Sequence, residues 1–508
     1  TIIYNCYQVV SRLNVFKIIE EHNNFDTALL YRGKKTTYKE LLEKSKKLSD
    51  VINKHTENIP EPVGVFISGS LDFSVSFFSI AHADKVIMPL NVNLKKAEFV
   101  RIIKYLDIRI IITNDLFYDR LIKLIDNDIT VICLNADGDV KFVNDVTDMR
   151  HIEYNNELKD VALILHTSGS LDSPKSVMLT HENLLSCIHS ISEDLNITQK
   201  NNTLIILPMY YASATISQFL THLYAGGTVT FMDTIFTSEN LFYNIANYKI
   251  TNFSCIPSML SEVLNNLSKI EKYDLSSLKY VCFGGAFAAG NKVNELVKYF
   301  SNVKFIRTYG LTEASTRISH YVEQPDVIND TCVGKCIPNV KVRIVDKNEN
   351  DCRIGEIGEI TVKGPNVMKG YYMRTDETEK VMINGWLHTG DLGRIDEENN
   401  LYIVGRRKNI IIRNAENIYP EEIEGVLNSC PQIKESFVYG EPHELLGEVP
   451  AAIIVINDGF EFKKQELINY CYNKLSSSKI PVKFIVADKI EKTSNGKIDR
   501  GFRKEEFV

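Results

Sequence analysis

A hydroxyl-rich turn that ends in a lysine is the segment best suited to binding phosphate. Its candidate phosphate-binding residues are Thr167, Ser168, Gly169, Ser170 and Lys175. Backbone N–H groups, hydroxyls and an ammonium can all bind phosphate oxygens. The turn nearly matches the Walker pattern at Gly169, Lys175 and Ser176, but Pro174 replaces a glycine and removes one N–H donor. Taken alone, the turn is equally consistent with an ordinary polar loop.

Three further segments combine glycine turns with aromatic or charged side chains. Thr308–Glu313 could stack a base, touch a phosphate and hold a hard cation through oxygen. Gly385–Asp391 ends in an aspartate, which can accept hydrogen bonds from both hydroxyls of a ribose. Lys497 follows a glycine turn near the end of the chain. Taken singly, these segments are also typical of a strand end, a hairpin turn and a solvated loop.

The elements that must position these segments alternate between helix and strand patterns. Thr37-x-x-Glu40 has capping-box spacing and opens an amphipathic helix that extends to Val51. Short apolar runs bounded by polar residues predict strands at 63–67, 110–113, 130–134, 161–165, 204–207, 228–232 and 280–283. This alternation predicts an α/β protein with largely parallel sheets.

The pattern changes after about residue 330. Residues 340–345, 355–362 and 400–404 read as β-hairpin material, which favours a more open β subdomain. The last hundred residues contain their own strand signal at 451–456 and helix signal at 465–475. We therefore expect a domain boundary near Lys408.

Composition excludes several classes of function. The 508 residues exceed the size of a single core, and a net charge of -7 provides no field for binding nucleic acid. Ten cysteines without a C-x-x-C pair indicate reduced thiols rather than a zinc site. No export signal or membrane span is recognisable, so we expect a cytoplasmic protein.

The order and spacing of the segments resemble the adenylate-forming (ANL) superfamily. This superfamily includes acyl- and aryl-CoA synthetases, the adenylation domains of nonribosomal peptide synthetases and beetle luciferases. The resemblance runs from Thr37 to Lys497 and is carried by Thr167–Val177, Leu207–Tyr211, Gly284–Ala286, Tyr309–Glu313, Gly385–Asp391, Gly405–Arg406, Glu416–Pro420 and Gly496–Lys497. It implies a large N-terminal domain (1–407) of parallel-rich α/β subdomains plus a β subdomain, and a small mobile α+β C-terminal domain (408–508).

The same resemblance implies a role for each matching residue. Thr167, Ser168, Gly169, Ser170 and Lys175 would hold the ATP phosphates. Thr312 would touch phosphate, Glu313 would ligate Mg²⁺ and Tyr309, followed by Gly310, would stack on adenine. Gly284, Gly285 and Ala286 would admit the nucleotide and the acyl group, and Asp391 with Arg406 would bind the ribose. Lys497 would be the catalytic lysine that bridges the carboxylate and the α-phosphate, and Lys408 the hinge.

Departures from the superfamily pattern bear on both half-reactions. Leu171, Asp172 and Ser176 replace the usual threonine and glycines of the phosphate loop, and a carboxylate at Asp172 would repel the triphosphate. Asn414-Ala415 occupies the place of a glycine pair beside the expected thiol channel. Ile490-Glu491 stands where Leu-Pro is usual.

The expected substrate is a small carboxylic acid without an α-amine. Amino-acid-activating relatives carry an aspartate where this chain has Ser213, and a buried ammonium without a counter-charge is costly. Tyr210 and Tyr211 suggest an apolar and aromatic pocket, although they could equally be core residues. The acceptor implied is the pantetheine thiol of CoA, with a carrier protein as the alternative.

Two hypotheses from other classes remain open at this point. A P-loop NTPase is supported by the partial Walker match and opposed by Pro174. A non-catalytic nucleotide-binding relative is motivated by Asp172 and Asn414-Ala415 and opposed by Glu313, Asp391 and Lys497.

Overall fold

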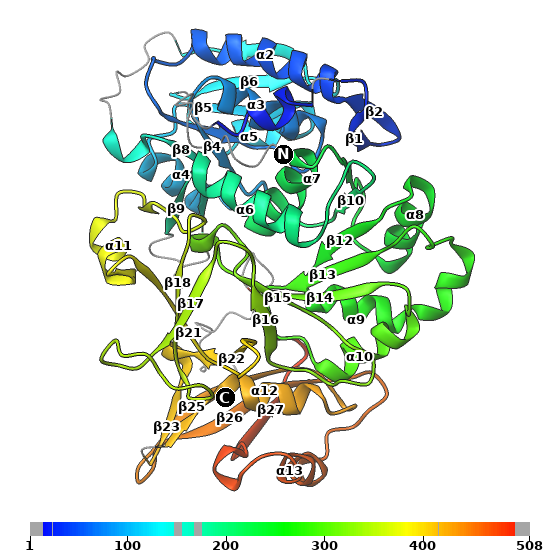
Figure 1. Ribbon diagram of the computed structural model, residues 1–508, viewed down its shortest axis with the longest axis vertical. Helices are drawn as coiled ribbons and strands as arrows, with labels where there is room; N and C mark the ends of the chain where they lie inside the picture. The colour runs from blue at the N-terminus through cyan, green and yellow to red at the C-terminus, as the bar shows by residue number, and fades with distance from the viewer. Residues whose placement is uncertain are drawn as a thin grey trace.

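The computed structural model describes residues 14–22, 24–126, 128–146, 155–166, 175–414 and 416–492. Its strands form three sheets (Figure 1). The first has 14 strands in the order β17-β18-β21-β22-β16-β15-β14-β13-β12-β10-β11-β1-β2, with β20 beside β21. The second has eight, in the order β19-β9-β8-β4-β3-β5-β6-β7. The third has five, in the order β24-β23-β26-β25, with β27 beside β26.

The strands of the first sheet have the following bounds: β1 (Thr27–Tyr31), β2 (Lys34–Thr37), β10 (Asn202–Ile205), β11 (Thr228–Phe231), β12 (Asn252–Cys255), β13 (Tyr280–Gly284), β14 (Lys304–Tyr309), β15 (Ser319–Val322), β16 (Cys332–Cys336), β17 (Lys341–Val345), β18 (Gly358–Lys363), β20 (Met382–Ile383), β21 (Trp386–Ile395) and β22 (Leu401–Arg406). The run from β1 through β11, β10, β12 and β13 to β14 is parallel. From β14 onward the pairings are antiparallel.

The strands of the second sheet are β3 (Pro62–Val65), β4 (Val86–Pro89), β5 (Ile110–Asn114), β6 (Thr130–Leu134), β7 (Val140–Asn144), β8 (Val161–His166), β9 (Ser176–Thr180) and β19 (Gly370–Tyr371). Its centre is parallel, and antiparallel strands close both ends. Both large sheets thus confirm the predicted α/β class, with mixed edges. The predicted β subdomain is continuous with the first sheet through β15 and β16.

The main helices are α2 (Tyr38–Lys54), α3 (Leu71–His82), α4 (Lys96–Tyr105), α5 (Asp115–Ile122), α6 (His181–Asp194), α7 (Thr221–Tyr224), α8 (Ser238–Tyr248), α9 (Pro257–Asn265), α10 (Gly290–Tyr299) and α11 (Thr375–Val381), with a short α1 (Lys17–Glu20). Helix α2 begins at the predicted capping box. The Glu40 backbone N–H donates to Thr37 Oγ1 at 3.2 Å, and the Thr37 N–H donates to Glu40 Oε2 at 2.7 Å. None of the described helices has the length and apolar composition needed to cross a bilayer.

An aromatic core joins α3 to a π-helical segment, η2 (Ser213–Leu220). Helix α3 is buried almost throughout, and its Ser74, Ser76 and Ser79 hydroxyls donate to carbonyls one turn earlier, which satisfies them inside the core. The rings of Phe73, Phe77 and Phe78 lie 5.7–6.0 Å from that of Phe219 on η2. This packing fixes η2, whose residues reach the cavity described below.

The C-terminal part is a small α+β domain (Figure 1). Its elements are β23 (Ile411–Arg413), β24 (Glu416–Ile418), α12 (Pro420–Asn428), β25 (Ile433–His443), β26 (Gly447–Ile456), α13 (Lys464–Tyr472) and β27 (Lys483–Val486). They enclose a separate core that includes Ile423, Leu427, Val438 and Leu467. Between β22 and β23 lies one 3₁₀ turn, η5 (Arg407–Asn409), so the chain changes sheets at Lys408.

We predict that Phe219→Ala lowers the free energy of unfolding of the large domain by about 3–5 kcal/mol, because the fully buried ring leaves a cavity among Phe73, Phe77, Phe78 and Phe231. Urea unfolding followed by circular dichroism measures the loss. The control is Phe25→Ala, whose ring is 78% exposed and whose loss should stay within about 0.5 kcal/mol. Equal losses in the two variants would contradict the role assigned to the aromatic core.

Candidate active site

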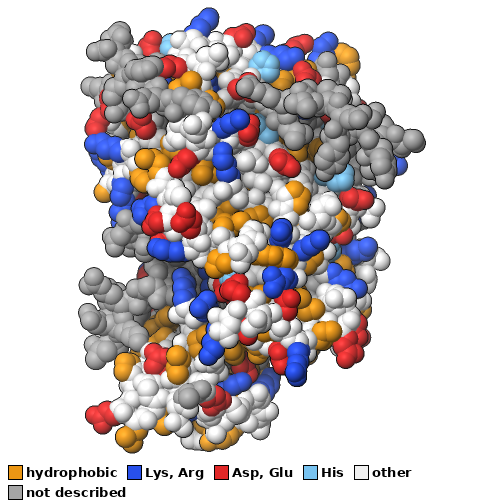
Figure 2. All heavy atoms as spheres, turned by 60° about the vertical axis from the view of Figure 1, so that its left-hand side comes forward, with side chains coloured by type: hydrophobic (Ala, Val, Ile, Leu, Met, Phe, Trp, Pro, Cys, Tyr) orange, Lys and Arg blue, Asp and Glu red, His pale blue; other side chains and the backbone are white. Residues whose placement is uncertain are grey.

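A cavity of about 940 Å³ extends from the first sheet to the C-terminal domain. Lys and Arg side chains gather beside the hollow between the large and small parts of the molecule (Figure 2). Twelve of the predicted site residues line the cavity: Lys175, Tyr210, Tyr211, Ser213, Gly284, Gly285, Ala286, Gly310, Thr312, Glu313, Arg406 and Lys408. Thr167, Ser168, Gly169, Ser170 and Lys497 lie outside the described residues, as do Asp172 and Ala415.

The glycine turn at the end of β13 forms one wall of the cavity. A Cβ on Gly284 would lie 2.4 Å from the carbonyl oxygen of Thr308 on β14, and Gly285 has a φ of +80°. A side chain at Gly284 would displace β14, and the left-handed backbone at Gly285 favours glycine. Gly284 and Gly285 both line the cavity, and no described residue fills the space next to Gly285, so no side chain of this turn screens its backbone.

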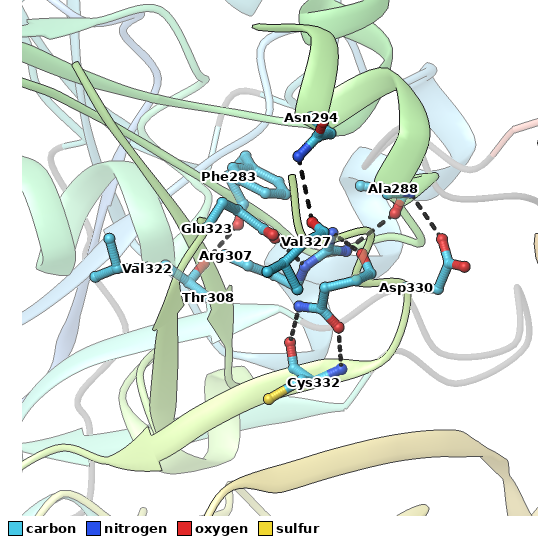
Figure 3. A network of polar contacts seen from close by, with 12 residues as sticks. Phe283, Ala288, Asn294, Arg307, Thr308, Val322, Glu323, Val327, Asp330 and Cys332 are labelled. Carbon is cyan, nitrogen blue, oxygen red and sulfur yellow. Dashed lines mark hydrogen bonds and ion pairs between the residues drawn. The ribbon is translucent and has the colours of Figure 1, made fainter. Parts of the chain in front are cut away.

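Arg307 anchors the segment that follows this turn (Figure 3). Its guanidinium donates to Glu323 Oε1 at 2.6 Å, to the Ala288 carbonyl at 3.0 Å and to the Asn329 carbonyl at 2.7 Å. Both side chains of the ion pair are buried, and burial raises the pKa of Glu323 against the opposing charge of Arg307. Asp330 accepts from the Gly290 N–H at 2.7 Å, where α10 begins. The second half of the loop 285–290 is thus held at Ala288 and at Gly290.

The segment after β14 brings Thr312 and Glu313 to the cavity. A Cβ on Gly310 would lie 1.8 Å from the Thr316 carbonyl oxygen, so the close fold-back of this segment requires glycine. Thr312–Ala314 forms a 3₁₀ turn, η4. Glu313 Oε1 accepts a hydrogen bond from the Tyr371 hydroxyl at 2.8 Å. The Tyr371 hydroxyl therefore orients the Glu313 carboxylate at the cavity wall.

Asp391 lies inside a strand and not after a turn, which corrects the expectation for 385–391. The turn is confined to Asn384–Gly385, and β21 pairs Asp391 with Arg406 of β22. Arg406 Nε donates to Asp391 Oδ1 at 2.7 Å, and the Tyr309 hydroxyl donates to Oδ2 at 2.8 Å. Because this carboxylate raises the pKa of Arg406 and burial raises that of Tyr309, both donors keep their protons. Arg406 lines the cavity, whereas Tyr309 and Asp391 are not among its lining residues.

The phosphate-loop candidate connects two antiparallel strands. It follows β8 and leads into β9, which pairs back with β8 from His166↔Ser176 to Val161↔Thr180. A Walker loop instead leads from a strand into a helix, so this topology excludes the P-loop NTPase hypothesis. Lys175, at the exit of the loop, pairs with Glu377 Oε2 at 2.9 Å and lies 4.6 Å from the centre of the Tyr371 ring.

Another part of the cavity wall is built by η2 and the residues before it. Tyr210 and Tyr211 stack edge to face at 4.8 Å, and burial raises the pKa of both, so their hydroxyls are neutral. Ser213 opens η2, and Ser217 follows on the same segment at the cavity wall. π-Helical segments are frequent at functional sites.

The C-terminal domain completes the cavity. Lys434, Glu435 and Ser436 of β25 line it, and Lys492 reaches Glu435 Oε1 at 2.8 Å. The described chain thus ends beside the cavity, five residues before Lys497.

Several residues of the site lie outside the motifs of the sequence. Arg307, Tyr371, Glu377, Ser217 and Arg317 act on or line the cavity, yet none belongs to a recognised motif. Only Arg317 could have been found from the sequence, because it follows the Thr312-Glu313 pair closely and is charged.

Comparison with known proteins agrees with this geometry. The family described as AMP-binding enzyme matches residues 19–372, and the AMP-binding enzyme C-terminal domain matches residues 422–497. The chain therefore belongs to the AMP-binding enzyme family. It is an AMP-forming acid–thiol ligase.

Individual relatives match over nearly their whole length. A 2-succinylbenzoate–CoA ligase of Bacillus velezensis is 29% identical over 480 residues, covering 93% of each chain. An o-succinylbenzoate CoA synthetase of Bacillus subtilis in complex with its acyl-adenylate superimposes with a TM-score of 0.82 at 26% identity, covering 96% of this chain and 97% of that one. A structure of the same enzyme with ATP and magnesium ion also has a TM-score of 0.82, at 26% identity, covering 96% and 98%.

We predict that Glu323→Gln destabilises the large domain by about 3–5 kcal/mol, because it leaves Arg307 buried without a counter-charge. The matched double variant Arg307→Met/Glu323→Leu should recover most of this loss but raise the KM for ATP, since the Ala288 carbonyl loses its anchor. Urea unfolding and ATP titration measure the two effects. A double variant with unchanged KM would show that the ion pair does not position the loop.

Proposed function

We propose that this ligase adenylates a small carboxylic acid without an α-amine and transfers the acyl group to CoA. The observation that carries the proposal is the convergence of Lys175, Thr312, Glu313 and Arg406 with the Gly284–Ala286 turn on one cavity that both domains line. Cations, hydroxyls and one carboxylate around an open backbone suit a nucleotide triphosphate beside a second anion.

The nucleotide site follows from these positions. Lys175, together with Thr167, Ser168, Gly169 and Ser170, holds the β- and γ-phosphates, and it exchanges its contact with Glu377 for phosphate oxygens when ATP binds. Asp391, oriented by Arg406 and Tyr309, accepts hydrogen bonds from the ribose. The Tyr309 ring, behind Gly310, supports the adenine.

Magnesium fits the residues present. Among the described residues, no group of three or more His, Cys, Asp or Glu side chains could hold a metal ion alone. Mg²⁺ is commonly bound by one or two carboxylates together with substrate phosphates, and Glu313 supplies such a carboxylate. When bound there, Mg²⁺ neutralises charge on the departing pyrophosphate.

The first half-reaction joins two anions. The carboxylate oxygen of the acid attacks the α-phosphorus, forming the mixed anhydride acyl-AMP, and the bond to pyrophosphate breaks. Thr312 donates to the phosphate, and the role proposed for the Lys497 ammonium is to bridge the carboxylate and the phosphate, where negative charge develops. Lys497 therefore acts electrostatically and transfers no proton.

The second half-reaction requires a different placement of residues 408–508. We assign the hinge to Lys408, because the chain changes sheets there over one short turn. Rotation about it withdraws the segment that carries Lys497 and admits the thiol, which attacks the acyl carbonyl as AMP leaves. The boundary 1–407/408–508 follows from the same turn.

The position of Ser213 supports an acid without an α-amine. It opens η2 at the cavity wall, and no carboxylate stands at this position to pair with an ammonium. The two relatives compared above are named for succinylbenzoate, an acid that has no amine.

Asn414 supports a functional thiol channel despite the missing glycine. Its φ of +47° is left-handed, a conformation that asparagine adopts more readily than most residues, and its N–H donates to the Leu446 carbonyl at 2.8 Å. The backbone shape that a glycine would supply is therefore retained. A carrier protein presents the same pantetheine thiol and is the alternative acceptor.

Pyrophosphate exchange over a panel of aliphatic, aryl and amino acids tests the first half-reaction. Exchange with non-amino acids, followed by thioester formation with CoA, is the expected outcome. Exchange restricted to amino acids would refute the acid class, and acyl transfer to a holo-carrier protein but not to CoA would refute the acceptor.

We predict that Lys497→Ala abolishes acyl-AMP formation yet spares transfer from supplied acyl-AMP to CoA, because the lysine is withdrawn in the second step. Single-turnover assays of each half-reaction measure the effect. Lys489→Ala is the control, since its exposed ammonium pairs with Glu491 away from the cavity lining and its loss should leave both steps within a few-fold of the parent. Equal loss of both steps in Lys497→Ala would contradict the proposed role.

A further inference from the structure

Within the described part of the chain, one arginine of the cavity wall has no counter-charge. Arg317 lies between η4 and β15, is only 4% exposed and lines the cavity. Among the residues that the structure describes, it forms no ion pair, and its Nη1 has no hydrogen-bond partner. The other buried arginines differ, because Arg307 pairs with Glu323 at 2.6 Å and Arg109 with Glu61 at 2.8 Å.

The surroundings of Arg317 are neutral. Its charge acts on Cys187 of α6 and on Tyr280 and Cys282 of β13, so the guanidinium lies between the sheet and α6. Burial raises the pKa of Cys187 to about 12 and also raises those of Tyr280 and Cys282, although Arg317 opposes each shift. All three groups are therefore uncharged. A water molecule would supply a hydrogen bond here, but not the missing negative charge.

A second unpartnered donor lines the same cavity. Ser217, on η2, is 5% exposed, and its Oγ has no hydrogen-bond partner. The buried serines of α3 contrast with it, since Ser74, Ser76 and Ser79 each donate to a carbonyl of their own helix. A buried hydroxyl without a partner costs stability unless a ligand completes it.

We propose that Arg317 and Ser217 form a carboxylate-binding subsite, so that the acid activated by this enzyme carries a second carboxylate remote from the one that is adenylated. The inference rests on the proposed function and names its substrate class. A carboxylate provides one negative charge and two acceptor oxygens, which match the uncompensated guanidinium and the two free donors. Cation and hydroxyl together favour this anion over an apolar acyl tail, which would leave both donors buried and unbound.

Matched pairs of acids test the subsite. Succinate, glutarate, adipate and 2-succinylbenzoate are each compared with the methyl ester of their distal carboxylate in pyrophosphate exchange. The parent enzyme should prefer at least one diacid over its half ester by on the order of 100-fold in kcat/KM, since esterification removes the charge that Arg317 binds. Equal kcat/KM for every diacid and its half ester would overturn the subsite and leave the ligase function standing.

Substitutions locate the preference. Arg317→Gln should lower kcat/KM for the preferred diacid by on the order of 100-fold without lowering it for the half ester, and Arg317→Lys should retain part of the preference. Ser217→Ala should cost about tenfold, on the diacid alone. A loss that falls equally on diacid and half ester in these variants would show a structural role and overturn the proposal.

Thermal unfolding separates binding from catalysis. Without acid, Arg317→Met should unfold no lower than the parent protein, because it removes an uncompensated buried charge. At least one diacid of the panel should raise the unfolding temperature of the parent protein but not that of Arg317→Gln, and its half ester should raise neither. If no acid of either kind supports exchange, the proposed function fails, but the thermal shift still decides the subsite. No shift of the parent protein with any diacid would overturn the subsite.

Discussion

The buried ion pair between Arg307 and Glu323 is the constraint on which the cavity wall depends. Arg307 stands opposite Phe283 in the β13–β14 register, one residue before the Gly284–Thr308 contact that forces a glycine at the end of β13. The same guanidinium holds the carbonyls of Ala288 and Asn329. Because a buried charge tolerates few arrangements of its partners, this pair fixes the relation of two strands and two loops at once. Tyr309, Thr312 and Glu313 follow on the strand that it holds.

The sequence predicted the parallel framework well, for a physical reason. Strands buried on both faces, such as β5 and β6, are nearly continuous apolar runs, and their pattern is local. The α2 capping box is equally local, since Thr37 and Glu40 are three residues apart. Asp391 shows the limit. The glycines around Asp391 are typical of a turn, but Asp391 belongs to β21 and pairs with Arg406 of β22. Nothing in the sequence of either segment indicates that the two strands pair.

The missed part of the site has a common cause. Glu313 is oriented by Tyr371, and Lys175 is paired with Glu377. Each contact joins residues that are far apart in the sequence and become neighbours only when the chain folds. The partial Walker match had the opposite problem. Its residues are local, but their meaning depends on whether a helix or an antiparallel strand follows, and β9 decides this. The spacing of residues along the chain therefore predicted phosphate binding. The order and direction of the strands then decided between a Walker loop and the phosphate loop of an adenylate-forming enzyme.

Two buried arginines within ten residues illustrate how structure and function divide a site. Each of the three guanidinium nitrogens of Arg307 donates a hydrogen bond, and Glu323 compensates its charge inside the protein, so its contribution is to geometry. Arg317 is equally buried but uncompensated, and a chain selected only for stability would replace it with an apolar residue of similar volume. Local departures from good packing are expected where a protein binds its ligand. The buried guanidinium of Arg317 destabilises the free enzyme, but it attracts an anion that enters the cavity. The same charge therefore lets the enzyme discriminate between acids with and without a second carboxylate.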